Sequence, residues 1–168
     1  MEDLLRYNFV TVNTPIEGLC FRFLNANVPH QCFDENKTAE WYRKSRVKLR
    51  RLFLNNIREL AKSYRSDPDL KFFMMADLNT SPDDPFMQNL VYSYGSPMLD
   101  AVKEEYRYIS TWNNKGATNR IDYILYSRGM ISERSGAKVR FTEVDDSPIT
   151  EKTSDHCILV GGIIIDDV

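Results

Sequence analysis

The chain has 168 residues, enough to bury one hydrophobic core, and we expect a single domain over residues 1–168. Its formal net charge of −2 excludes an overall electrostatic attraction to nucleic acids or membranes and leaves room only for local charged patches. Its three cysteines show no CxxC spacing, so neither a disulfide framework nor a zinc site is expected. The N-terminus lacks the apolar core of a signal peptide, and the longest apolar run, CILVGGIII, is too short to cross a bilayer. We therefore expect an intracellular protein without a transmembrane segment.

The first part of the chain predicts a β-hairpin followed by a long helix. Residues 7–13 and 19–28 have strand-like composition, and the turn formers at 14–18 separate them. From about residue 38 to residue 65, apolar side chains recur every three or four positions, which predicts an amphipathic helix. The other faces of this helix carry Arg43, Lys44, Arg46, Lys48, Arg50 and Arg51. We interpret these faces as solvated surface, with a phosphate-attracting patch as the second interpretation.

The rest of the chain alternates strands with shorter elements. Residues 70–76 form a continuous apolar run, as expected for a strand buried on both faces. We predict a helix over 84–94 and a short element over 98–106. Further strands are expected over 120–126, 138–144 and 157–165. Strands interleaved with helices indicate an α/β layered fold.

Polar side chains lie at the ends of these apolar strands or inside them. Asp77 and Asn79 follow the run 70–76 and, two apart in an extended chain, would face the same side. Asp122 lies inside RIDYIL, where a buried carboxylate needs a compensating partner. Asp155 and His156 come directly before the last strand and place an anionic ligand beside a titratable imidazole.

Each of these clusters alone has a structural explanation. Asp77 and Asn79 are common turn formers, Asp122 could pair with Arg120, and His156 could be a hydrogen-bonded core residue. Together, however, they are the groups that metal-assisted phosphoryl chemistry uses. Carboxylates are hard ligands that suit Mg²⁺, and an imidazole with a pKa near neutrality can take a proton from water.

Three motifs, in this order, resemble the endonuclease/exonuclease/phosphatase superfamily: ADLN at 76–79, RIDY at 120–123 and SDH at 154–156. The stretch 111–127 and LDAV at 99–102 are also similar to that family, which includes deoxyribonuclease I-like nucleases, deadenylases and sphingomyelinases. The resemblance implies a layered β-sandwich flanked by helices, of which this chain would be a partial domain with its N-terminal portion missing or shortened. It also implies a phosphodiester hydrolase that uses Mg²⁺ or Mn²⁺.

The resemblance further implies a role for each motif residue. Asp77 and Asn79 would hold the attacking water and the scissile phosphate, Asp122 would orient His156, and His156 would be the general base. Asp155 would help to hold the metal. The implied substrate-binding positions are Asn27, His30, Asn119 and Arg120.

This sequence departs from the family pattern in two places. Asn27 stands where the family has a histidine, and an asparagine cannot exchange a proton near neutral pH; His30 could replace it. The family's metal-binding glutamate lies in an earlier segment that this chain does not match. We therefore expect weak Mg²⁺ binding and a second chain or copy that completes the sheet.

Two functions are compatible with these motifs. The first is a hydrolase acting on a phosphodiester, with nucleic acid as the leading candidate; RNA, DNA, a phosphoinositide and a sphingolipid stay open. The alternative is a catalytically impaired family member that serves as a binding or assembly partner.

Overall fold

Five strands form an open central sheet in a computed structural model that describes residues 6–13, 20–28, 40–65, 70–102, 104–114, 117–127, 137–145 and 155–165. Their order across the sheet is β1-β2-β3-β7-β4. The bounds are β1 (Arg6–Asn13), β2 (Cys20–Asn27), β3 (Leu70–Asp77), β7 (Asp122–Ser127) and β4 (Met98–Asp100). Only β2 and β3 are parallel, so the sheet is mixed.

The predicted hairpin and long helix are confirmed. β1 pairs with β2 antiparallel along its whole length, and α1 (Glu40–Arg65) carries the chain back to β3 beside β2. The expected turn at 14–18 lies outside the described residues. This β2–α1–β3 crossover matters for the site, because it places the C-terminal ends of two parallel strands side by side.

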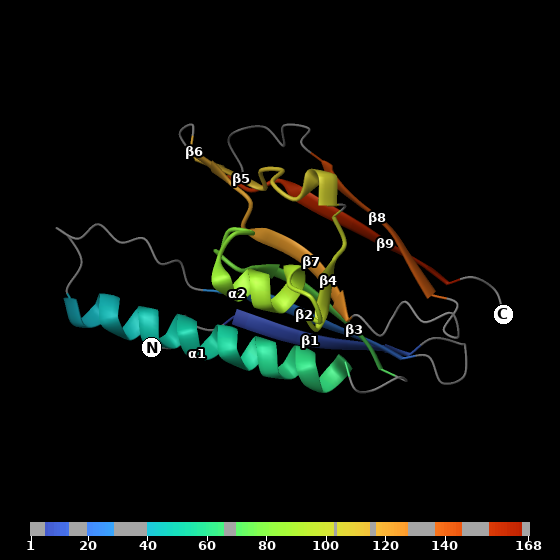
Figure 1. Cartoon of the computed structure of the whole chain (residues 1–168), viewed down its shortest axis with the longest axis horizontal. Coiled ribbons are helices and arrows are strands. Elements are labelled where there is room, and N and C mark those ends of the chain that lie inside the picture. Colours follow the sequence, from blue (N-terminus) through green and yellow to red (C-terminus); the bar gives the residue numbers. More distant parts are fainter. Residues whose placement is uncertain are drawn as a thin grey trace.

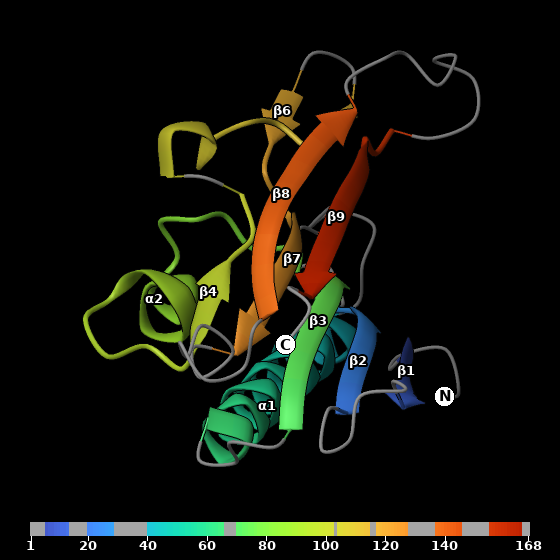
Figure 2. The ribbon, with the colours of Figure 1, turned by 90° about the vertical axis from the view of Figure 1, so that its right-hand side faces the viewer.

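The molecule has three layers (Figures 1 and 2). α1 lies against one face of the sheet, and the hairpin of β8 (Ala137–Asp145) and β9 (Ile158–Ile165) lies on the other. The apolar stripe of α1 packs Phe53 and Ile57 into the core with Phe72 and Met74 of β3. The predicted strands at 138–144 and 157–165 are therefore confirmed as one antiparallel pair.

The opposite face of the central sheet has its own aromatic cluster. Phe21, Phe73 and Tyr126 are buried there, and the ring of Phe23 stacks on that of Phe73 with centroids 5.2 Å apart. β3 thus buries alternate residues on its two faces, as its continuous apolar sequence predicts. Met75 is the exception, since it is exposed.

The elements after β3 differ from the prediction. Residues 84–94 do not form one regular helix: α2 (Pro85–Met87) begins after Asp84, whose carboxylate accepts the Phe86 N–H at 2.7 Å, and continues as the π-helix η1 (Gln88–Tyr92). The Ser93 N–H reaches the Gln88 carbonyl at 2.7 Å, which closes the wider turn. The expected element at 98–106 consists of β4 and the 3₁₀ turn η2 (Glu104–Tyr106).

A small hairpin that the sequence did not reveal follows η2. It consists of β5 (Trp112–Asn114) and β6 (Ala117–Asn119), and it leads directly into β7. In the part of the chain that the structure describes, no helix is long and apolar enough to span a membrane.

Candidate active site

The site is built on the ends of three neighbouring strands. Asn27, Asp77 and Asp122 are register partners across β2, β3 and β7, so they form one row across the ends of these strands. Residues in such a row face the same side. Asp77 and Asp122 therefore place two carboxylates next to each other on the face that carries the β8–β9 hairpin.

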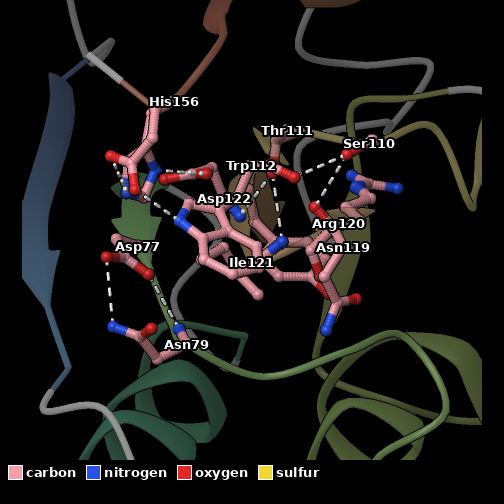
Figure 3. Close-up of polar contacts among 12 residues, drawn as sticks. Asp77, Asn79, Ser110, Thr111, Trp112, Asn119, Arg120, Ile121, Asp122 and His156 are labelled. Atoms are coloured by element: carbon pink, nitrogen blue, oxygen red, sulfur yellow. Dashed lines mark hydrogen bonds and ion pairs between the residues drawn. The ribbon is translucent and has the colours of Figure 1, made fainter. Parts of the chain in front are cut away.

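His156 reaches this row because the short strand β5 holds the segment before β9. Trp112 and His156 form an antiparallel bridge. On either side of it, the Asn113 N–H donates to the Asp155 carbonyl and the Cys157 N–H donates to the Thr111 carbonyl, both at 2.8 Å. Figure 3 shows His156 entering the cluster from above, opposite Asp77 and Asn79.

The imidazole of His156 is hydrogen-bonded to Asp122. Its Nδ1 lies 2.9 Å from Asp122 Oδ2, within the reach expected of a base and the group that orients it. Burial alone would lower the pKa of His156, but the hydrogen bond to Asp122 and the charges of Asp122, Asp77 and Asp155 raise it above the ordinary value. The ligand atoms of Asp77, Asp122 and His156 all lie within 4.8 Å of one another.

Asn79 reaches the cluster through a turn and not through the strand alternation that its sequence position suggested. β3 ends at Asp77, and Asn79 adopts a left-handed conformation with φ 48°, which asparagine tolerates better than most residues. Its backbone N–H donates to Asp77 Oδ1 at 2.9 Å, and its Nδ2 donates to Asp77 Oδ2 at 3.1 Å and to the Val28 carbonyl at 2.8 Å. These bonds fix the Asp77 carboxylate from below (Figure 3).

A buried arginine supports this turn from the α1 side. Arg50 is 2% exposed and donates to the carbonyls of Leu78 at 2.9 Å and Asn79 at 3.2 Å, and to the Thr80 hydroxyl. Burial lowers its pKa, while the charges of Asp84 and Asp77 oppose that shift. The prediction of a solvated position is therefore wrong for Arg50. Its spacing from Phe53 and Ile57, three and seven positions, is the signal that it belongs to the buried stripe.

Asp155 lies on the other side of His156. Its Oδ2 accepts the indole N–H of Trp112 at 2.9 Å, and its Oδ1 lies 3.9 Å from His156 Nε2. This carboxylate is exposed, whereas Asp122 is more enclosed. The imidazole thus has a carboxylate near each of its two nitrogens.

The expected substrate-binding residues are not all at the cluster. Asn27 is exposed at the end of β2 beside Asp77, and Asn119 is exposed at the end of β6. Arg120 is buried elsewhere: it pairs with Asp100 at 2.8 Å and stacks over Tyr123. It is therefore not the partner of Asp122. His30 lies outside the described residues.

Thr111, Trp112 and Arg50 are the residues around the site that sequence reasoning missed. Thr111 is completely buried, and its hydroxyl accepts the N–H groups of Ile121 and Asp122 at 3.0 Å each. Apart from its likeness to the family stretch, the segment that begins at Thr111 carries no apolar alternation that would have indicated a strand.

Comparison with known proteins identifies the family. Residues 9–156 match the model of the Endonuclease/Exonuclease/phosphatase family. The chain belongs to this family. No curated protein sequence matches it.

Solved structures of the endonuclease/exonuclease/phosphatase family have the same fold. The human Nocturnin catalytic domain is 16% identical, with a TM-score of 0.52 over 94% of this chain and 53% of its own. A humanized D. rerio TDP2 is 16% identical, with a TM-score of 0.51 over 90% and 58%. A family protein from Bacteroides thetaiotaomicron is 16% identical, with a TM-score of 0.50 over 90% and 53%. The chain therefore spans little more than half the length of these structures, and the likeness establishes the DNase I-like α/β fold alone.

The donor set of the cluster fits a hard divalent cation. The three carboxylates of Asp77, Asp122 and Asp155 surround one imidazole closely enough for their charges to act on it. Several carboxylate oxygens converging on one place are the arrangement that Mg²⁺ or Mn²⁺ prefers. The same surplus of negative charge is costly without a cation or a proton to compensate it.

Proposed function

We propose that this site hydrolyses phosphodiester bonds with the help of Mg²⁺ or Mn²⁺, and that His156 is the general base. The observation that carries the proposal is the 2.9 Å hydrogen bond between His156 Nδ1 and Asp122 Oδ2, formed beside the Asp77 carboxylate. Water is a weak nucleophile, and a base held by a second group is the arrangement that activates it.

The hydrogen bond sets the role of each imidazole nitrogen. With its Nδ1–H donated to Asp122, the neutral ring carries its lone pair on Nε2, which we assign as the atom that takes the proton from water. Asp122 both selects this tautomer and stabilises the imidazolium that forms. Asp77 and Asn79, held together by two hydrogen bonds, would orient the water and the scissile phosphate on the opposite side of the cluster.

Asp155 is the residue that we assign to the metal. Its carboxylate is exposed, Trp112 holds its Oδ2, and its Oδ1 lies 3.9 Å from His156 Nε2, so this carboxylate is within reach of a cation at the cluster. Bound Mg²⁺ would supply neutralisation of the charge on the phosphoryl group. A site with only one or two protein carboxylates holds Mg²⁺ weakly when no substrate phosphate is bound. We therefore expect weak Mg²⁺ binding by the chain alone.

Nucleic acid is the substrate class that we favour. Arg50 marks the point where α1 passes the Asn79 turn, and the ten residues of α1 before it continue for about 15 Å beyond. Figure 1 shows this N-terminal part of α1 projecting past the strands. Lys44 and Lys48 are exposed on it, and Arg51, directly after Arg50, is exposed as well. A basic extension beside the cluster suits a chain of phosphates better than a single small phosphate ester.

The test is hydrolysis of single- and double-stranded oligonucleotides and of a small phosphodiester by the purified chain with Mg²⁺. We expect His156→Ala and Asp122→Asn to lower kcat by about 10²- to 10⁴-fold, the usual contribution of general-base catalysis. Glu59→Gln, on the exposed face of α1, is the control for removing a carboxylate charge. Hydrolysis that persists in His156→Ala would refute the assigned base. Oligonucleotide binding without turnover in the wild type would favour a catalytically impaired binding partner.

We further propose that residues 1–168 form one partial domain whose sheet is completed by a second chain or copy. Val10 and Val12 of β1 are 55% and 43% exposed, and their register partners on β2 are Phe23 and Phe21 of the aromatic cluster. Exposed apolar side chains that extend a buried cluster are typical of a surface that another protein covers.

A further inference from the structure

Thr111 is bonded to both chain segments that bring the catalytic pair together. Its hydroxyl accepts the N–H groups of Ile121 and Asp122 at 3.0 Å each, at the start of β7. Its carbonyl accepts the N–H of Cys157 at 2.8 Å, directly after His156. Its own N–H donates to the Asn119 carbonyl at 3.1 Å, which fixes Thr111 on the β5–β6 hairpin.

We propose that Thr111 is the positioning residue for the Asp122–His156 pair. Its side chain sets the backbone of Asp122, and its main chain sets the backbone of His156. The contact between the two functional side chains thus depends on one residue that touches neither of them. The proposal rests on the function proposed above only for its effect on turnover, because the positioning itself is a property of the folded chain.

Two features of Thr111 support this role. It is completely buried, so no water can replace its hydroxyl as the acceptor for the two N–H groups. It is also β-branched, which restricts its side chain to few rotamers and keeps the hydroxyl on the β7 side. Figure 3 shows Thr111 beside Ile121 and Asp122, with dashed lines for the bonds that its hydroxyl accepts.

The geometry predicts what happens when the hydroxyl is lost. In Thr111→Val the shape is kept, but the N–H groups of Ile121 and Asp122 lose their acceptor, so the first residues of β7 shift. A displacement of about 1 Å at a reacting group can cost about 100-fold in rate. We expect kcat to fall by about 10- to 100-fold with little change in KM, since substrate contacts are untouched.

The experiment compares Thr111→Val with Thr111→Ser and Thr118→Val. Thr111→Ser retains the hydroxyl and should restore both kcat and the spectrum. Thr118 is exposed on β6, so Thr118→Val is the matched control for the same change of side chain. The spectroscopic readouts are the ring ¹⁵N signals of His156, which report the Nδ1–H tautomer, and the exchange rates of the Ile121 and Asp122 amide protons. The chain has only two histidines, so a His30→Gln background assigns the ring signals.

The proposal requires slow amide exchange at Ile121 and Asp122 in the wild type, which needs no variant to measure. It also requires a changed His156 ring signal in Thr111→Val and a wild-type signal in Thr111→Ser. Rapid wild-type exchange at both amides would overturn it. So would a Thr111→Val variant that loses stability but keeps the His156 signal and kcat, since that is the result of a purely structural role. If the wild type hydrolyses nothing while the spectra change as stated, the proposed function fails and the positioning role stands.

Discussion

Asp77 and Asp122 face each other as register partners on β3 and β7, so two carboxylates lie side by side at the ends of these strands. Like charges directly opposite on adjacent strands destabilise a sheet. The Asn79 amides donate to the Asp77 carboxylate, and the His156 ring is hydrogen-bonded to Asp122. A cation bound at the site would balance part of the charge of this pair.

The first prediction concerns that balance. Mg²⁺ should raise the unfolding temperature of the chain by more than NaCl of equal ionic strength, because a cation that binds only the folded site shifts the equilibrium toward it. Asp155→Asn should reduce the shift, since it removes the ligand that we assign to the metal. The measurement is differential scanning calorimetry at several Mg²⁺ concentrations. Equal shifts with NaCl and Mg²⁺ would show that screening alone is responsible.

The second prediction concerns the protonation of His156. Its pKa should lie above 6.5 in the metal-free chain and fall in Asp122→Asn, because the variant removes the hydrogen bond and the charge that raise it. NMR titration of the ring protons measures this value directly. An Asp122→Asn variant with an unchanged pKa would contradict the pairing.

The same raised pKa gives the sign of a stability effect. The folded state binds the proton more tightly than the unfolded chain, so the stabilisation is fully present below about pH 6.5 and is lost as the pH rises through the folded pKa. We expect urea unfolding of the wild type to show this loss and Asp122→Asn to show a smaller one, because the charges of Asp77 and Asp155 remain. The general base must be neutral, so activity should rise with pH over the same range.

The fold was predictable where the apolar pattern is regular. The hairpin of β1 and β2, the helix α1 and the buried strand β3 each have a clear period, and all are present. The helix predicted over 84–94 was wrong because periodicity does not distinguish an α-helix from the wider turn of η1, in which the Ser93 N–H donates to the Gln88 carbonyl. The β5–β6 hairpin was not predicted, because the strand Trp112-Asn113-Asn114 is short and polar.

The candidate site was predictable only in its motif residues. Asp122 and His156, 34 positions apart, were expected to touch, and they do. The residues that support the site could not be predicted: Arg50 holds the Asn79 turn through backbone carbonyls, and Thr111 holds the start of β7 through backbone N–H groups. Such contacts require only a donor or an acceptor at the right place, so the sequence carries no pattern for them. For Arg120 the sequence suggested a neighbouring partner, Asp122. The fold instead pairs it with Asp100, which is distant in the sequence.

The third prediction tests the support that Arg50 gives to the Asn79 turn. Arg50→Lys should lower the free energy of unfolding by about 1.5–3 kcal/mol, since one ammonium cannot reach the Leu78 and Asn79 carbonyls in the geometry of the guanidinium fork. Arg51→Lys, at the exposed neighbouring position, should change it by less than about 0.5 kcal/mol. Urea denaturation measures both. Equal effects would mean that the buried bonds of Arg50 contribute nothing.

The fourth prediction uses the left-handed backbone of Asn79. Asn79→Gly and Asn79→Ala both lose the carboxamide bonds to Asp77 and Val28, but only alanine is strained at φ 48°. Asn79→Ala should therefore be less stable than Asn79→Gly by about 1–2 kcal/mol, which urea denaturation can measure. Both should lose activity, because the Asp77 carboxylate loses its anchor. A glycine variant less stable than the alanine variant would contradict the assigned backbone strain.

The last prediction tests whether a second copy covers the exposed valines of β1, Val10 and Val12. Val10→Thr combined with Val12→Thr keeps the β-branched shape and the strand preference but removes apolar surface worth about 25 cal/mol per Å² when buried. If two copies pack through these valines, the wild type should self-associate in sedimentation equilibrium and the double variant should dissociate toward monomers. Val47→Thr, at an exposed position of α1, should leave association unchanged. A wild type that stays monomeric at every concentration would exclude a second copy at this surface.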